Sequence, residues 1–115
     1  MTKNRLCGIL GLARKAGKIT VGSESVIEGI RRGKALLVLV ACDASDNTKK
    51  MFADSCRYYG TELKVLALDS DELSSAIGKK SKTVALYISD GNFVNAVHKI
   101  IDDDGGCVYG STEQK

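Results

Sequence analysis

The alternation of helical and extended segments along the chain predicts an α/β fold, a three-layer α/β/α sandwich around a four-stranded mixed sheet. Two observations carry this prediction. Apolar residues recur at helical spacing in one set of segments, and short apolar runs of strand length lie between them. The chain has 115 residues, which is the usual size of one domain. We expect a single domain over residues 1–103 and a flexible polar tail over residues 104–115.

Local signals define the first three elements. Apolar residues at helical spacing precede Gly17, which ends the first helix, and a short extended piece follows. The second helix begins within residues 22–25, where Ser23 and the Ser25–Glu28 capping-box pair are alternative N-caps. The expected ranges are residues 4–16 for the first helix, 18–21 for the extended piece and 22–33 for the second helix.

The rest of the chain continues the alternation. Residues 36–41 are an unbroken apolar run, which is typical of a strand covered on both faces. Asp69 and Glu72 have capping-box spacing for a short helix, and Asp90 is expected to cap the last helix. Asp43 and Asp46 could mimic a metal-binding acidic pair, but capping of the helix that begins there explains both. The expected ranges are residues 36–41, 63–68 and 83–88 for the strands, and 43–60, 69–77 and 90–101 for the helices.

Basic residues are concentrated near the start of the chain. Residues 1–34 hold eight basic side chains against two acidic ones, whereas residues 35–115 hold nine basic and twelve acidic side chains. Such asymmetry favours a local surface for a polyanion over charge that only keeps the protein in solution. Solvated helix faces that happen to be basic are the alternative interpretation.

The positions of cysteine and histidine argue against a metal site and against disulfides. The four cysteines form no C-x-x-C pair, and the single histidine, His98, is far from three of them in sequence. We expect Cys7, Cys42 and Cys56 to lie in or near the core, and Cys107 to be an exposed thiol. The sequence therefore predicts no metal and no cofactor.

Membrane and enzymatic functions are not expected. No apolar run approaches the roughly 20 residues of a membrane helix, and the first residues lack the features of a signal peptide, so we expect a cytoplasmic protein. Residues 11–18 resemble a phosphate-binding loop, but five residues separate the two glycines and Ile19 replaces the required serine or threonine. His98 is expected at an exposed or rim position. A doubly wound α/β enzyme is therefore the least favoured alternative.

The turn into the second helix is the strongest candidate for a binding site. A helix N-terminus presents unpaired N–H groups and a positive dipole end, and Gly22 would let a ligand approach the backbone. Basic side chains can surround this turn, among them Lys18, Arg32 and Lys34. The loop at residues 78–82 carries Lys79, Lys80 and Lys82, and it forms a second part of the site if the sheet brings both to one edge.

Several stretches of the sequence match one family. They are residues 10–19, 21–24, 30–48, 56–59, 73–79 and 90–93. This pattern resembles the ribosomal-protein L7Ae family, and most closely its small bacterial YlxQ-like members, over nearly the whole chain up to Asp102. The resemblance implies the α/β/α sandwich and binding to kink-turn RNA, an internal-loop element with tandem sheared G·A pairs and a sharp bend.

The resemblance places the RNA-binding motif at the start of the second helix. The family usually has Gly-Thr-Asn-Glu followed three residues later by Lys, and the residues here are Gly22, Ser23, Glu24, Ser25 and Glu28. The glycine and the hydroxyl are kept, whereas the Asn, the Glu and the Lys are replaced. Guanine presents acceptors on its major-groove edge, so the replacements remove amide and ammonium donors that would meet them.

The sequence thus predicts a non-catalytic protein that binds a kink-turn or related internal-loop RNA, of ribosomal or translation-associated origin. The alternative is a protein-interaction module of the ribosome or of transcription with a degenerate RNA site, which Glu24 and Glu28 favour. Ribosomal components and transcription or translation factors are further candidate partners, and we expect a monomer. The expected RNA-binding residues are Lys18, Gly22, Ser23, Glu24, Ser25, Glu28, Arg32, Lys34, Lys79, Lys80 and Lys82.

Overall fold

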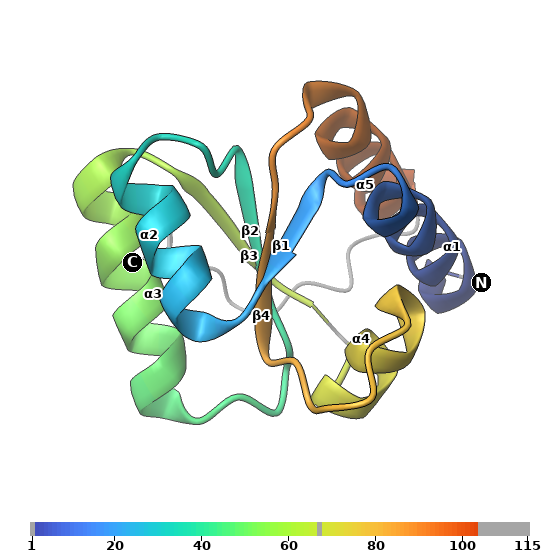
Figure 1. The fold of residues 1–115 in the computed structure, drawn as a ribbon, viewed down its shortest axis with the longest axis horizontal. Helices are drawn as coiled ribbons and strands as arrows, with labels where there is room; N and C mark the ends of the chain where they lie inside the picture. The colour runs from blue at the N-terminus through green and yellow to red at the C-terminus, as the bar shows by residue number, and fades with distance from the viewer. Residues whose placement is uncertain (1, 67, 104–115) are drawn as a thin grey trace.

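Within residues 2–66 and 68–103, which the structure describes, five helices and four strands alternate along the chain in this computed structural model (Figure 1). The predicted tail over residues 104–115 and the predicted thiol Cys107 lie outside the described residues. The helices are α1 (Thr2–Lys15), α2 (Ser23–Arg31), α3 (Asp46–Tyr59), α4 (Ser70–Ile77) and α5 (Gly91–Asp103). The strands are β1 (Ile19–Val21), β2 (Leu37–Val40), β3 (Glu62–Val65) and β4 (Ala85–Ile88).

The four strands form one mixed sheet in the order β1-β4-β2-β3. β2 and β3 are parallel, whereas β4 is antiparallel to both of its neighbours. The register pairs Ile19 with Ile88 and Val21 with Leu86, so the end of β1 lies beside the start of β4. This pairing places the turn into α2 next to the loop that precedes β4.

Helices cover both faces of the sheet, which confirms the predicted three-layer sandwich. α2 and α3 lie on one face, and α1, α4 and α5 lie on the other (Figure 1). Alternate residues of β2 enter different cores: Leu37 and Leu39 pack with α1, α4 and α5, whereas Val38 and Val40 pack with α2 and α3. Burial on both faces explains why this strand is an unbroken apolar run.

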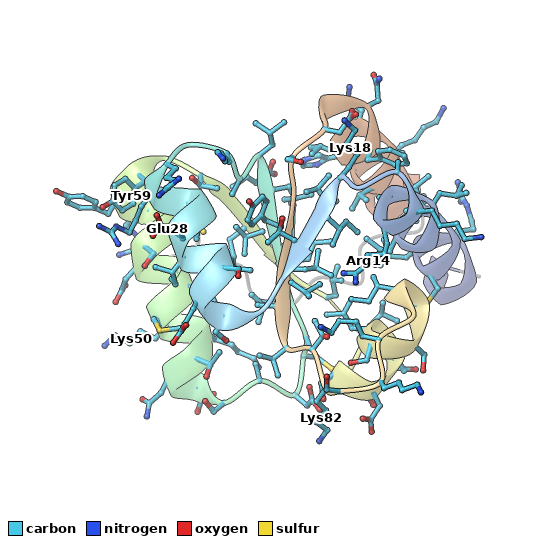
Figure 2. All side chains as sticks on the ribbon, viewed as in Figure 1. Arg14, Lys18, Glu28, Lys50, Tyr59 and Lys82 are labelled. Carbon is cyan, nitrogen blue, oxygen red and sulfur yellow. The ribbon has the colours of Figure 1, made fainter. Side chains whose placement is uncertain are left out.

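The topology also fixes the direction of α2 and α3. β1 and β2 are both antiparallel to β4, so they run parallel to each other. Each is followed by a helix that returns along the same face, so α2 and α3 are parallel and their C-terminal ends lie at one end of the molecule (Figure 1). Lys18, at the start of β1, and Lys82, before β4, lie at opposite ends (Figure 2).

The predicted cap of α2 is wrong. Gly22 is the N-cap, with φ at 103°, and no side chain of the described residues caps the helix. A positive φ turns the chain sharply into the helix and leaves Ser23 already in its first turn, beyond the cap position. Glu28 therefore does not form a capping box with Ser25; its carboxylate contacts two arginines, as described below.

The predicted caps of α4 and α5 are confirmed. The Asp69 carboxylate accepts from the Glu72 N–H at 2.8 Å while the Glu72 carboxylate accepts from the Asp69 N–H at 3.0 Å. Asp90 accepts from the Asn92 N–H at 2.7 Å at the start of α5. Among the described residues, no helix is both long enough and apolar enough to cross a membrane.

Candidate nucleic-acid interface

Helix α2 forms a ridge with a groove on each side. The groove on the side of the sheet, which we name the inner groove, has a volume of about 450 Å³. It combines carboxylates, hydroxyls, cationic side chains and one aromatic ring. Its lining residues are Thr20, Glu24, Ser25, Glu28, Gly29, Arg32, Lys34 and Tyr87.

Gly29 and Tyr87 form the floor of the inner groove. The Tyr87 ring lies so close to Gly29 that a Cβ at this position would overlap the ring atoms Cε2 and Cζ. Both residues are buried, and Tyr87 is only 7% exposed. A glycine in the middle of α2 therefore lets the helix approach β4 closely and sets the depth of the groove.

The turn into α2 joins the groove to β4. The Gly22 N–H donates to the Ala85 carbonyl at 3.4 Å, and the Gly22 carbonyl accepts the first helical hydrogen bond, from Val26, at 2.8 Å. Because Gly22 has no side chain to cap the helix, N–H groups in the first turn remain directed at the surface. Ser23, Glu24 and Ser25 are exposed in this turn.

A chain of hydrogen bonds fixes the basic loop before β4. The Ser74 hydroxyl donates to the Ser70 carbonyl at 2.7 Å and accepts from the Thr83 N–H at 2.7 Å. Ser70 in turn donates to the Asp43 carboxylate from its N–H at 2.9 Å and from its hydroxyl at 2.8 Å. This polar chain, Asp43–Ser70–Ser74–Thr83, attaches the loop to α4 and to the end of β2.

The role of Asp43 corrects the prediction that it caps its own helix. Ser45 caps α3 by accepting from the Thr48 N–H at 3.1 Å, and Asp43 instead accepts hydrogen bonds from Ser70, the first residue of α4. Partial burial acts to raise the pKa of the Asp43 carboxyl, but the hydrogen bonds from Ser70 outweigh it and hold this pKa below its ordinary value. The ionised carboxylate is thereby stabilised at the start of α4.

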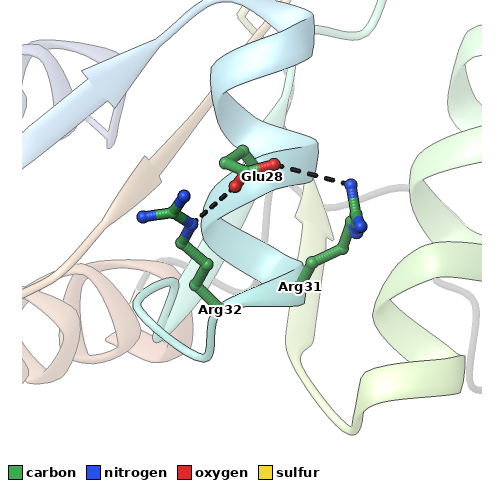
Figure 3. Close-up of polar contacts among 3 residues, drawn as sticks. All are labelled: Glu28, Arg31 and Arg32. Atoms are coloured by element: carbon green, nitrogen blue, oxygen red, sulfur yellow. Dashed lines mark hydrogen bonds and ion pairs between the residues drawn. The ribbon is translucent and has the colours of Figure 1, made fainter.

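Glu28 sits between two arginines on the ridge of α2 (Figure 3). One carboxylate oxygen lies 2.5 Å from Arg32 Nε and the other lies 3.5 Å from Arg31 Nη1. All three side chains are about half exposed, so these ion pairs add little to stability. Their effect is electrostatic, because Glu28 partly neutralises both arginines, of which Arg32 lines the inner groove.

The structure brings most of the predicted site residues into two groups. One group lies along the ridge of α2, and the other lies in the loop before β4 at one end of the molecule. Glu24, Ser25, Glu28, Arg32 and Lys34 line the inner groove from the start of α2 to the loop after it. Gly22 and Ser23 lie at the head of the groove. Lys79, Lys80 and Lys82 lie in the loop before β4, at that same end.

Lys18 is the predicted site residue that the structure separates from the rest. It lies at the far end of β1 from Gly22, and its carbonyl accepts from the Ser89 N–H at 2.9 Å (Figure 2). The prediction missed Thr20, Gly29 and Tyr87, which form one wall and the floor of the inner groove. Tyr87 lies in a strand whose four residues are all buried, so nothing around it in the sequence marks it as part of a polar groove.

The remaining titratable residues lie where the sequence suggested. Cys56 is buried, Cys7 and Cys42 are half-buried, and burial raises the pKa of the Cys56 thiol to about 12. His98 Nε2 lies 2.8 Å from Glu62 Oε1 at a partly exposed position, as expected of a rim residue. No group of three or more potential metal-ligating side chains gathers within the described part of the chain.

The fold and the polar, partly cationic groove beside α2 define a small α/β/α binding protein. The family model described as "Ribosomal protein L7Ae/L30e/S12e/Gadd45 family" matches residues 5–98. The chain therefore belongs to this family, which confirms the resemblance seen in the sequence.

The relatives are RNA-binding and ribosomal proteins. The chain is 37% identical to "RNA-binding protein YlxQ" of Bacillus subtilis, over 82% of this chain and 92% of that protein. It is 38% identical to the protein of the same name from Enterococcus faecium, over 87% and 94% of the two chains. It is 34% identical to "Large ribosomal subunit protein eL30" of Yarrowia lipolytica, over 70% and 74%. Membership of this non-enzymatic family confirms the expectation that the chain is not an enzyme.

Solved structures share the fold. A protein of unknown function from Bacillus halodurans superposes with a TM-score of 0.79 at 32% identity, covering 85% of this chain and 97% of that one. A 15.5 kDa RNA-binding protein of Giardia lamblia superposes with a TM-score of 0.72 at 21% identity, covering 89% and 86%. The second similarity shows the fold alone.

Proposed function

We propose that this protein binds structured RNA, a kink-turn or a related internal loop, through the inner groove and the basic loop before β4. Family membership over residues 5–98 is the observation that carries the proposal. The hydrogen bond between Gly22 and Ala85 supports it, because it joins the two predicted halves of the site at one end of the sheet. The protein acts without catalysis, as a cytoplasmic monomer in ribosome or translation-associated RNA–protein complexes.

Each part of the site suits a different part of an RNA. The N–H groups at the start of α2 and the helix dipole suit phosphate oxygens or base acceptors. The loop before β4 suits phosphates of the RNA backbone through Lys79, Lys80 and Lys82. Arg32 and Lys34 lie along the inner groove, and together with these lysines they form what we name the cationic frame. Phosphate contacts of this kind supply most of the affinity and make it depend on salt.

Glu24 and Glu28 set this groove apart from the usual motif of the family. A carboxylate cannot donate to the acceptors on the major-groove edge of guanine, and it repels nearby phosphates. We therefore infer that the cationic frame contributes more to affinity here than base-reading side chains do.

A titration with a kink-turn RNA at two salt concentrations tests the proposal. The control RNA has the same length but Watson–Crick pairs in place of the G·A pairs. Arg32→Ala with Lys34→Ala should weaken binding of all RNAs and reduce the salt slope, since each lost phosphate contact lowers the slope by about one. Charge reversal at Lys79 and Lys80 should weaken binding with little change in melting temperature. Unchanged slopes and affinities in both variants would remove this surface from the function.

Glu24 and Glu28 also favour a second candidate function. If the groove no longer meets RNA bases, its carboxylates and arginines suit a protein partner on the ribosome or in transcription. Salt-independent and weak binding to every RNA tested would favour this candidate over the first.

A further inference from the structure

The other side of the α2 ridge carries a second groove, which lies between α2 and α3 and which we name the outer groove. It has a volume of about 330 Å³, and its lining residues are Ser23, Glu24, Ile27, Glu28, Arg31 and Met51. Ile27 is half-buried and Met51 is 43% exposed, so the outer groove offers large non-aromatic apolar side chains, which the inner groove lacks.

An exposed aromatic pair extends this groove. Tyr58 is 81% exposed and Tyr59 is 46% exposed at the end of α3, with ring centroids 4.8 Å apart and planes at 80°. Figure 2 labels Tyr59. Tyr58 follows Met51 by seven residues, which is two helical turns, so both lie on the same face of α3. Because α2 and α3 are parallel, that face continues the outer groove beyond Arg31 at the end of α2.

Both cationic and anionic side chains surround this surface. Arg31 lines the outer groove, and Arg57 is exposed one position before Tyr58. Asp54 is exposed on α3 between Met51 and Tyr58, three residues after the first and four before the second, so it shares their face. Both cations thus lie near Tyr58, toward the C-terminal ends of α2 and α3, whereas the carboxylates Glu24 and Glu28 line the groove itself.

We propose that the outer groove and Tyr58 bind an unpaired segment of the same RNA that occupies the inner groove; this inference rests on the proposed function above. Glu24 and Glu28 line both grooves, so an RNA strand that crosses the α2 ridge passes directly from one to the other. A base stacks on the Tyr58 ring, a second base covers Met51 and Ile27, and phosphates contact Arg31 and Arg57. An exposed aromatic ring with cations nearby is typical of surfaces that bind single-stranded RNA.

Tyrosine, methionine and arginine are also enriched at protein interfaces. Continuity with the inner groove favours RNA, because a protein bound across the outer groove would have to share Glu24 and Glu28 with the RNA in the inner groove.

The test compares two RNAs that differ only in an unpaired extension. One is a blunt-ended kink-turn duplex, and the other carries a short oligouridine strand at its 3′ or its 5′ end. Wild type should bind one extended RNA about fivefold more tightly than the blunt RNA, at the low end of the effect of one stacked base. Tyr58→Ala should abolish this gain without changing affinity for the blunt RNA, whereas Tyr58→Phe should keep it.

Two further variants sharpen the test. Asp54→Asn should increase the gain from the extension, since it removes the carboxylate that repels the strand. Leu12→Ala, a truncation of a side chain that is 57% exposed on α1, should have no effect. Tight binding of the blunt RNA with no gain from either extension, or with a gain that Tyr58→Ala leaves intact, overturns the outer-groove proposal and leaves this face to a protein partner. Failure to bind the blunt RNA at all counts against the proposed function itself.

Discussion

Glu28 illustrates how one residue alters a site without changing its shape. Its carboxylate lines both grooves and contacts Arg31 and Arg32, so it places negative charge where the family usually has a lysine. The backbone of α2 and the floor of the inner groove do not depend on it. Its replacement therefore tests recognition separately from folding.

We predict that Glu24→Asn combined with Glu28→Lys tightens binding to a kink-turn RNA. The double change restores donors that face guanine acceptors and frees Arg31 and Arg32, with a gain of about 1–3 kcal/mol for a well-formed base contact. Titration against the G·A and the Watson–Crick control RNAs measures the gain. A control with the same change in charge, Asp71→Asn with Glu62→Lys, should give a smaller gain that does not distinguish the RNAs. A folded variant that binds no better than wild type would place the G·A pairs elsewhere.

The need for a glycine at position 29 comes from another element, because Tyr87 of β4 packs against it. We predict that Gly29→Ala lowers the free energy of unfolding by about 1–3 kcal/mol, because the added methyl overlaps the Tyr87 ring. Helix propensity alone would give the opposite sign, with a gain of up to about 1 kcal/mol. Gly8→Ala in α1 is the matched control, because Gly8 is exposed and has no heavy atom within 4 Å of an added Cβ. Chemical denaturation of both variants should therefore show shifts of opposite sign.

At the scale of elements, the start of α4 is held by a residue from a different loop. Asp43 accepts two hydrogen bonds from Ser70, and its pKa is held below its ordinary value of 3.8. A group with a lowered pKa in the folded state contributes stability above its unfolded pKa, and this contribution is lost as the pH falls.

We predict that Asp43→Asn lowers the free energy of unfolding by about 1 kcal/mol at neutral pH, since one strong acceptor becomes an amide donor. The difference in stability from wild type should shrink as the pH falls below 3.8, because the wild-type carboxyl then becomes protonated and loses its charge. Denaturation curves at several pH values measure this difference. Asp71→Asn, in the first turn of the same helix, controls for the general effect of charge on the helix dipole. If the difference did not depend on pH, the loss of stability would come from the changed shape of the side chain and not from the charge of the carboxylate.

The sequence predicted the features that neighbouring residues determine. The prediction failed where a contact with a distant part of the chain determines the structure. The apolar run at residues 36–41 and the Asp69–Glu72 capping box carry their own signals, and both predictions are confirmed. Asp43 bonds to Ser70 on another element, and no local pattern distinguishes this from a cap of its own helix. The close approach of Gly29 to Tyr87 likewise depends on sheet order.

The candidate site shows the same difference between local and distant determinants. The sequence could predict that five residues lie close together, because they lie on or directly after one helix; they are Glu24, Ser25, Glu28, Arg32 and Lys34. It could not predict the position of Lys18, because three strand residues are enough to carry it to the other end of the molecule from the start of α2.

At the scale of the whole molecule, one sheet separates two apolar cores. Leu10 of α1 belongs to one core and Phe52 of α3 to the other, and both are fully buried. The strands contribute to both cores through alternate residues, so neither core can form without the sheet. The two faces should therefore unfold together.

We predict that Leu10→Ala and Phe52→Ala each shift one common unfolding transition, with losses of about 2–5 kcal/mol. Far-ultraviolet circular dichroism and tyrosine fluorescence should give coincident curves for wild type and for both variants. Separate transitions for the two probes in either variant would mean that the cores unfold independently.

If the proposed site binds RNA, the polar chain Asp43–Ser70–Ser74–Thr83 also bears on how fast that RNA is captured. Its hydrogen bonds form within the protein alone, so the loop before β4 does not have to become ordered when an RNA arrives. For the proposed RNA site, we therefore expect association to proceed as a single encounter step without a preceding conformational change. We expect its rate to be limited by diffusion and by electrostatic steering toward the lysines of the loop, and so to fall as the ionic strength rises.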